Sequence, residues 1–266
     1  LQWLEHLLQH RWPELRVHVA STTDQWAGVA VAGPRARDAL SRVVRGDVSA
    51  EALPFMGIAH VEIDTGEGRV PAMVARISFS GELAFEVYAG SGHGPALWRA
   101  LKGAVVAEGG VPYGLEALGA LRIEKGHVTG AELDGRTTLS DAGLARMAST
   151  KKAFIGKVLG ARPALTDPER PRLAHFEPVV GDERFSIGAI VCEEGKVEGH
   201  GIGWITGVTR APALGDCWLG IGFVAGGPEA WAGRTVVIAD PVRGRETRAR
   251  VESPHQFDPK GERMHG

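Results

Sequence analysis

Apolar residues recur at helical spacing in several segments of the chain. Leu1, Leu4, Leu7 and Leu8 share one face of the first ten residues, which predicts a helix there. The same spacing predicts helices at 36–44, 95–108, 115–125 and 141–147. Glycines follow two of them, at 109–110 and at 126, as is typical of helix ends.

Shorter runs with β-strand character lie between and beyond these helices. In the first part of the chain they occupy 17–20, 28–32, 54–63 and 69–77. Later runs, separated by glycine or proline, occupy 188–192, 201–204, 218–224 and 235–239. This order predicts an α+β fold, with an antiparallel-sheet domain that carries helices followed by a small C-terminal β-barrel domain.

One segment has the composition of a linker. Residues 161–172 include prolines at 163, 168 and 171 and many charged side chains. We therefore expect a first domain at 1–160 and a barrel domain at 173–266. The chain begins with Leu1 inside a helical pattern, so we expect it to be a piece of a longer polypeptide.

Composition excludes several classes of function. The formal net charge is −2, so no global basic field attracts nucleic acid. No apolar run approaches the roughly 20 residues of a membrane-spanning helix. Cys192 and Cys217 form neither a disulfide framework nor a metal-ligand spacing, so we expect no metal site and a cytoplasmic setting.

The most informative stretch runs from Arg76 to Tyr88. Apolar and polar residues alternate, which places the two sets on opposite faces of a strand, with a turn at 80–82. Composition alone favours a strand with one solvated face. The alternative is that Glu86 lines a cavity, where its carboxylate can accept two parallel N–H bonds from a pterin-like edge.

These residues resemble the folate-binding aminomethyltransferase family. Residues 78–87 read SFSGELAFEV, which is similar to the family signature S/Y-F/Y-T/S-G-E-x-G-x-E-I. GLEALGALRIEKG at 114–126, DAGL at 141–144 and FIGK at 154–157 follow at the family's distances. DQWA at 24–27, GPRAR at 33–37 and FDPKGER at 257–263 are similar to the subgroup of sarcosine oxidase alpha subunits.

The resemblance implies roles for individual residues. Glu86 matches the glutamate that grips the pterin ring of tetrahydrofolate, and Ser80, Tyr88 and Trp204 are further candidates for cofactor binding. Glycine-cleavage enzymes carry an arginine where this chain has Leu118, which argues against that subgroup. The family's catalytic aspartate lies upstream of residue 1, so no catalytic residue is assigned.

The resemblance also implies an activity. It is the capture, as 5,10-methylenetetrahydrofolate, of the one-carbon unit released by an oxidised amine such as sarcosine or dimethylglycine. FAD, FMN and NAD are then expected on other segments or on flavin-bearing partner subunits. Two alternatives stay open: an aminomethyltransferase of the glycine-cleavage type, and a non-catalytic folate-binding protein.

Overall fold

The computed structural model describes residues 1–197 and 199–265 and divides the chain into two compact units. The sheet unit comprises 1–78 and 82–112, with the last residues of the chain. The barrel unit comprises Phe79–Gly81 and Tyr113–Arg263. The linker expected at 161–172 stays a prediction; helix α6 (Pro163–Thr166) lies within it.

The sheet unit is built on five antiparallel strands in the order β1-β5-β4-β3-β2. Their bounds are β1 Trp26–Ala32, β2 Val44–Arg45, β3 Ile58–Asp64, β4 Arg69–Ala75 and β5 Ala84–Gly90. The predicted turn between β3 and β4 closes where the Asp64 carboxylate accepts the N–H of Gly66 at 3.1 Å. The alternating segment 84–90 forms a strand, as expected, and it lies between β1 and β4.

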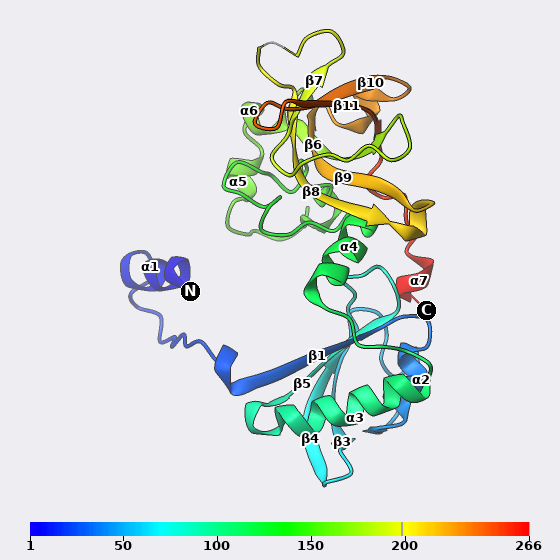
Figure 1. The fold of residues 1–266 in the computed structure, drawn as a ribbon. Helices are drawn as coiled ribbons and strands as arrows, with labels where there is room; N and C mark the ends of the chain where they lie inside the picture. The colour runs from blue at the N-terminus through cyan, green and yellow to red at the C-terminus, as the bar shows by residue number, and fades with distance from the viewer. Residues whose placement is uncertain (198, 266) are drawn as a thin grey trace. The chain divides into compact units, whose positions relative to one another are not determined.

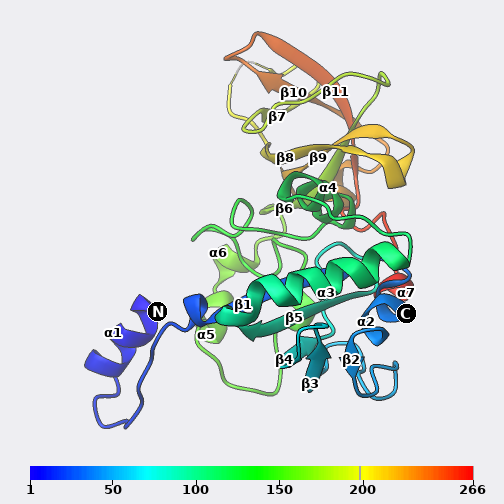
Figure 2. The same cartoon turned by 60° about the horizontal axis from the view of Figure 1, so that its bottom comes forward.

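Two helices cover one face of this sheet. α2 (Ala36–Ser41) and α3 (Gly94–Ala107) lie across it, as Figures 1 and 2 show. Phe85 and Val87 of β5 pack there against Leu97 and Leu101 of α3, all buried. Neither α2 nor α3 lies over the opposite face of the sheet (Figure 2).

The barrel unit contains a closed antiparallel barrel with strand order β10-β11-β6-β9-β8-β7. The bounds are β6 Pro171–Pro178, β7 Ile190–Glu193, β8 Gly203–Ala211, β9 Cys217–Ala225, β10 Thr235–Asp240 and β11 Arg245–Glu252. Phe176, Ile205 and Val236 belong to the buried cluster of its interior. Helix α4 (Leu115–Lys125) packs Ile123 against Leu219 and Ile221 in a second cluster. The predicted fold class is confirmed.

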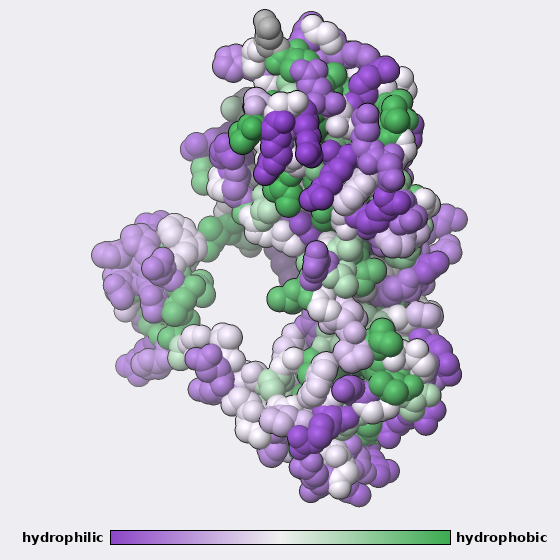
Figure 3. Space-filling view, viewed as in Figure 1, coloured by the Kyte–Doolittle hydropathy of each residue, from purple (hydrophilic) through white to green (hydrophobic). Residues whose placement is uncertain are grey.

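Arginines line the outward side of β11. Arg248 and Arg250 alternate with the inward Thr247 and Ala249. Arg248 pairs with Glu194 at 2.8 Å and Arg250 with Glu177 at 3.3 Å. Hydrophilic side chains are prominent on the face of the barrel unit seen in Figure 3. These arginines therefore form a solvated, charge-balanced strand face.

Some elements differ from the sequence predictions. α1 (Gln2–His10) forms, but none of its residues is buried, and residues 17–20 form no strand. The helix expected at 141–147 is reduced to the 3₁₀ turn Ala145–Met147, because the Asp141 carboxylate accepts bonds from Thr138 and Arg170. Strands β6 and β11 were not predicted.

The remaining helical elements are short and lie before, between and after the strands. They are η1 Thr23–Gln25, η2 Ser91–His93, α5 Lys157–Gly160, η4 Pro212–Leu214, η5 Pro228–Trp231 and α7 Glu262–His265. No helix in the described part of the chain combines the length and apolarity needed to cross a membrane.

Candidate functional site

Glu86 and Tyr88 lie on the face of the sheet opposite to α2 and α3. Their neighbours Phe85 and Val87 are fully buried on the helix-covered face, whereas Glu86 and Tyr88 are half-buried. This follows from the alternation of side chains along a strand. The strand therefore holds both polar side chains outward from a rigid, central position in the sheet.

The two side chains are joined by a hydrogen bond. The Tyr88 hydroxyl donates to Oε2 of Glu86. This bond, together with burial and the charge of Glu86, raises the pKa of Tyr88 to about 12. The phenol therefore stays a proton donor at neutral pH and orients the carboxylate. No side chain or backbone group of the described residues bonds to Oε1, which leaves an acceptor for a ligand.

A glycine on the neighbouring strand makes room for Tyr88. Gly28 of β1 is the register partner of Tyr88, and a Cβ at Gly28 would lie 3.0 Å from Cε1 of the Tyr88 ring. The ring therefore lies over the backbone of β1. Any larger residue at this position would push the phenol away from Glu86.

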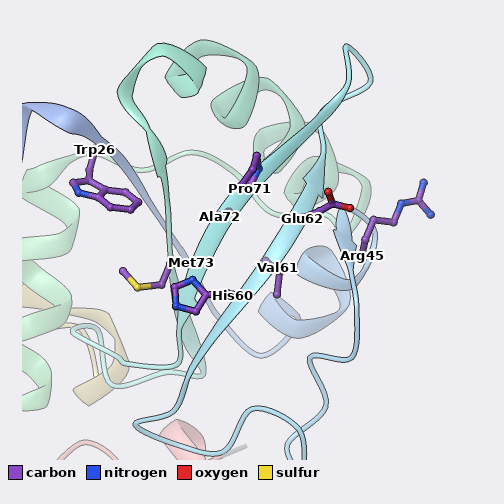
Figure 4. Close-up of a pocket in the computed structure, with 8 residues that line it drawn as sticks. All are labelled: Trp26, Arg45, His60, Val61, Glu62, Pro71, Ala72 and Met73. Atoms are coloured by element: carbon purple, nitrogen blue, oxygen red, sulfur yellow. The ribbon is translucent and has the colours of Figure 1, made fainter.

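A pocket of about 420 Å³ continues along the same face of the sheet. Met73 is the register partner of Tyr88, and His60 is the partner of Met73. The side chains of Trp26, Met73 and His60 gather toward one end, whereas Glu62 and Arg45 lie at the other (Figure 4). The volume falls within the range of pockets for small organic ligands, roughly 300–1,000 Å³.

Ser80 lies in a tightly packed loop of the barrel unit and is 3% exposed. The carbonyl of Phe79 bonds to Nδ1 of His127 at 3.0 Å. Gly81 has a φ of +85°, and a Cβ there would lie 2.7 Å from Lys125 Cδ. The loop is thus fixed by the end of α4, and a direct role for Ser80 in cofactor binding stays a prediction.

Trp204 belongs to β8 of the barrel unit. Its ring stacks on Phe223 of β9, with centroids 5.1 Å apart. Of the four residues predicted for cofactor binding, the structure brings Glu86 and Tyr88 together, while Ser80 and Trp204 belong to the other unit. A role of Trp204 in folate binding stays a prediction.

Sequence reasoning missed Gly28, Met73 and His60. Their proximity to Tyr88 depends on the register of strands β1, β4 and β3, which residue type alone does not reveal. The alternation of polar and apolar residues along β3 and β4 could have indicated that His60 and Met73 lie on the more exposed face of the sheet.

Comparisons with known proteins agree with this architecture. The model of the GCVT N-terminal domain matches residues 1–152. A sarcosine oxidase subunit alpha from Rhizobium meliloti (strain 1021) is 38% identical over 98% of the chain, which spans 26% of that relative. One from Corynebacterium sp. (strain P-1) is also 38% identical, over the whole chain and 27% of the relative.

More distant relatives include aminomethyltransferases. The one from Rubrobacter xylanophilus is 32% identical over 97% of the chain and 65% of the relative. The chain thus spans about a quarter of the length of the sarcosine oxidase alpha subunits that it resembles. With more than half of its residues matched by one family model, the chain belongs to the family of the GCVT N-terminal domain.

Proposed function

We propose that the chain binds tetrahydrofolate, with Glu86 accepting two N–H bonds from the edge of the pterin ring. The observation that carries this is the half-buried carboxylate on the open face of the sheet, oriented by Tyr88 and with Oε1 available. A carboxylate pairs well with two parallel donors, and such charge-assisted bonds are roughly twice as strong as neutral ones.

The face of the sheet that carries Glu86 also offers groups that suit a flat heterocycle. Met73, the register partner of Tyr88, supplies a polarisable thioether, and Trp26 supplies an aromatic ring; both line the neighbouring pocket, which Glu86 itself does not line. Tyr88 donates a hydrogen bond to Glu86 and, at a pKa of about 12, keeps its proton at physiological pH. The carboxylate is therefore held in one orientation before a ligand arrives, which lowers the entropic cost of binding.

We further propose that this binding serves one-carbon transfer within a larger protein of the sarcosine oxidase alpha type. Bound tetrahydrofolate supplies the nitrogen nucleophiles that take up the one-carbon unit as 5,10-methylenetetrahydrofolate. The role of this chain is to hold the folate where an imine can reach it before hydrolysis. Holding two reactants together replaces a bimolecular encounter with an effectively unimolecular step.

The oxidation that generates the imine would belong to other parts of such a protein. FAD, FMN and NAD are proposed to bind other segments or flavin-bearing partner subunits. A cytoplasmic location remains part of the same proposal. The similarity to named sarcosine oxidase subunits supports this division of labour.

An aminomethyltransferase is the second candidate. The 32% identity to the Rubrobacter xylanophilus protein over 97% of the chain favours it. It requires transfer from an aminomethylated carrier protein without oxidase subunits. Co-purification of the full-length protein with flavin-bearing subunits would support the oxidase candidate, and activity with a carrier protein alone would support the transferase.

Replacement of Glu86 tests the proposed site directly. We expect Glu86→Ala to weaken tetrahydrofolate binding by roughly 2–4 kcal/mol, because one partner of a buried, charged pair of hydrogen bonds is lost. In a calorimetric titration this corresponds to an increase in Kd of roughly 30- to 1,000-fold. Glu86→Gln should also weaken binding, because the amide keeps the shape but loses the charge.

Glu67→Ala is the matched control. Glu67 lies in the turn between β3 and β4 of the same unit, outside the pocket lining, and its side chain is 62% exposed. We expect its replacement to leave Kd within a factor of about 3, as is usual for exposed charges. An unchanged Kd for Glu86→Ala would rule out the proposed role of Glu86.

A further inference from the structure

The sheet unit contains an arginine whose side chain is almost entirely buried. Arg76 follows the last residue of β4, and it is 2% exposed. Its backbone N–H donates to the carbonyl of Gly57, and its own carbonyl accepts the N–H of Met56, each at 2.9 Å. The backbone therefore holds this side chain in the interior of the unit, where an arginine is rarely found without a charged partner.

The hydrogen-bond partners of the Arg76 guanidinium are neutral. Its Nη1 donates to the carbonyl of Leu53 at 3.1 Å, and its Nη2 donates to the carbonyl of His265. All of these residues belong to the sheet unit. Two carbonyls satisfy two of the N–H groups, but they do not neutralise the charge, and a guanidinium does not lose its proton in a protein. Arg76 is therefore a buried cation.

A second arginine lies close to this one. Nη1 of Arg37, in α2, donates to the carbonyl of Val48. Val48 and Leu53 lie in the same loop between β2 and β3, so both guanidinium groups bond to one short segment. Burial lowers the pKa of Arg76, and the charge of Arg37 adds to this effect. Two like charges are thus held near one another in the protein interior.

These two arginines differ from others in the sheet unit in having no acidic partner. Arginines of this unit that pair with a carboxylate are found at positions 35, 42, 45, 69 and 99. Within residues 1–197 and 199–265, neither Arg37 nor Arg76 forms an ion pair. The charge of Arg37 is offset in part by the Phe85 ring, whose centre lies 5.3 Å from Cζ.

The carboxylate of Asp47 does not neutralise the pair. Its Oδ1 accepts the N–H of Ser49 at 2.8 Å. The bonds from Ser49 are the main reason that the pKa of Asp47 is lowered, and the charge of Arg37 contributes least. Asp47 is exposed to solvent, where water screens its charge.

Each guanidinium also keeps a buried donor without a partner. Nε of Arg76 and Nη2 of Arg37 are closed off from solvent, and neither bonds to any group in the described part of the chain. An unbonded buried donor destabilises a fold, more so when it belongs to a charged group. A water molecule could accept one of these N–H groups, but only an anion also balances the two charges.

From these observations we propose that a small monovalent anion binds between Arg37 and Arg76, with Nη2 of Arg37 and Nε of Arg76 as its donors. Because Nη1 and Nη2 of Arg76 already donate to carbonyls, Arg76 offers a single N–H rather than the parallel pair that suits a carboxylate or a phosphate. A multivalent anion would also lose more hydration energy on burial. A halide such as chloride meets both conditions.

This site is separate from the proposed pterin site. Arg37 contacts the ring of Phe85 on the face of the sheet that α2 and α3 cover, whereas Glu86 lies on the opposite face. The bound anion is therefore a structural ligand, which stabilises the junction of α2, the loop at 46–57 and the end of β4. The proposal does not depend on folate binding.

The dependence of stability on the type of anion tests the proposal in solution. Chloride is raised at the expense of gluconate, with total salt constant, so that the screening of surface charges does not change. We expect the Tm of the purified chain to rise by about 2–4 °C between about 10 and about 300 mM chloride, because the ligand binds only the folded state. Equal Tm values across this series would overturn the proposal.

Replacement of either arginine should abolish the chloride response. Arg37→Gln is the main variant, because it leaves both bonds of the Arg76 guanidinium to carbonyls in place. Arg99→Gln is the matched control: Arg99 lies on α3 of the same unit and pairs with Glu67 at 2.6 Å. It should keep the full response. A response of wild-type size in Arg37→Gln would overturn the proposal.

Crystals grown in bromide locate the anion directly. Bromide is a halide close in size to chloride, and its anomalous scattering identifies it. We expect an anomalous peak within hydrogen-bonding distance of Nε of Arg76 and Nη2 of Arg37. The measurement uses the wild-type chain, so it remains decisive even if Arg76→Met fails to fold. Peaks at surface positions alone would show an adventitious ion only, and they would overturn the proposal, as would a protein carboxylate found between the two arginines.

Discussion

At the scale of single residues, a buried histidine has a strongly lowered pKa. His175 of β6 is fully buried, and neither ring nitrogen has a hydrogen-bond partner among the described residues. Burial lowers its pKa to about 4, and His255 and Arg122 act in the same direction. The nearby backbone of Ile123 acts to raise the pKa of His175, but it does not meet the geometry of a full hydrogen bond to the ring.

This histidine makes the stability of the barrel unit depend on pH. Between about pH 6.5 and pH 4, His175 is protonated in the unfolded chain but stays neutral in the folded chain. The free energy of unfolding should therefore decrease as the pH is lowered from about 6.5 to about 4, by roughly 3 kcal/mol for His175. Urea denaturation at several pH values measures this slope.

Substitutions identify the source of the slope. His175→Leu should flatten it, while His200→Leu, at an exposed histidine of the same unit, should not. Some slope should persist, because burial also lowers the pKa values of His127 and His255, and Lys125 adds to both shifts. Identical slopes in His175→Leu and the wild-type chain would contradict this account.

At the scale of elements, the end of α4 depends on one glycine. Gly126 has a φ of +75° and follows the last helical residue, Lys125. A Cβ at Gly126 would lie 2.0 Å from the carbonyl oxygen of Pro254. Because strain and a backbone clash add, Gly126→Ala should lower the free energy of unfolding of the barrel unit by about 2 kcal/mol or more.

Gly233→Ala provides the comparison. Gly233 also has a positive φ, +73°, but nothing lies within 4 Å of the Cβ it would gain. We expect a loss of about 1 kcal/mol from the backbone conformation alone. Equal losses at the two positions in chemical denaturation would show that Pro254 exerts no steric constraint.

Elements whose stability is local were predictable from the sequence. Helix α3 and the hairpin of β3 and β4 follow from apolar spacing and turn residues, and they form where expected. The strand expected at 17–20 fails because a strand needs a pairing partner, and none of the described residues pairs with it. The sequence did not predict β6 because prolines precede and begin it, nor β11 because its arginines are untypical of a strand.

The candidate site was predictable only in part. Alternation along 84–90 and the family signature pointed to Glu86, and the strand does hold it on the open face. The pairing of Glu86 with Tyr88 and the room left by Gly28 depend on side-chain placement and strand register.

At the scale of the whole molecule, each unit has its own core. The buried cluster of the sheet unit draws on residues 31–104, and those of the barrel unit on residues from 123 onward. Phe85→Ala should therefore open the sheet unit, since removal of a buried phenylalanine costs roughly 3–5 kcal/mol. Amide hydrogen exchange, read peptide by peptide, should rise in the sheet unit and stay unchanged in the barrel unit.

Phe176→Ala gives the converse experiment, because Phe176 is fully buried inside the barrel. In Phe176→Ala, amide hydrogen exchange should become faster in the barrel unit only and stay unchanged in the sheet unit. Parallel increases in both units after either substitution would show that they unfold as one cooperative body.

The sheet and the barrel differ in whether they have edge strands. The barrel is closed and leaves no strand without two neighbours, whereas β1 is the outermost strand of the five-stranded sheet. Its sequence from Trp26 to Ala32 contains no charged residue and no proline, the two features that usually prevent an edge strand from pairing with another chain. None of the described strands pairs with the outer edge of β1, so its backbone amides and carbonyls there can pair with a strand of another polypeptide, and we expect any self-association of this chain to begin at this edge.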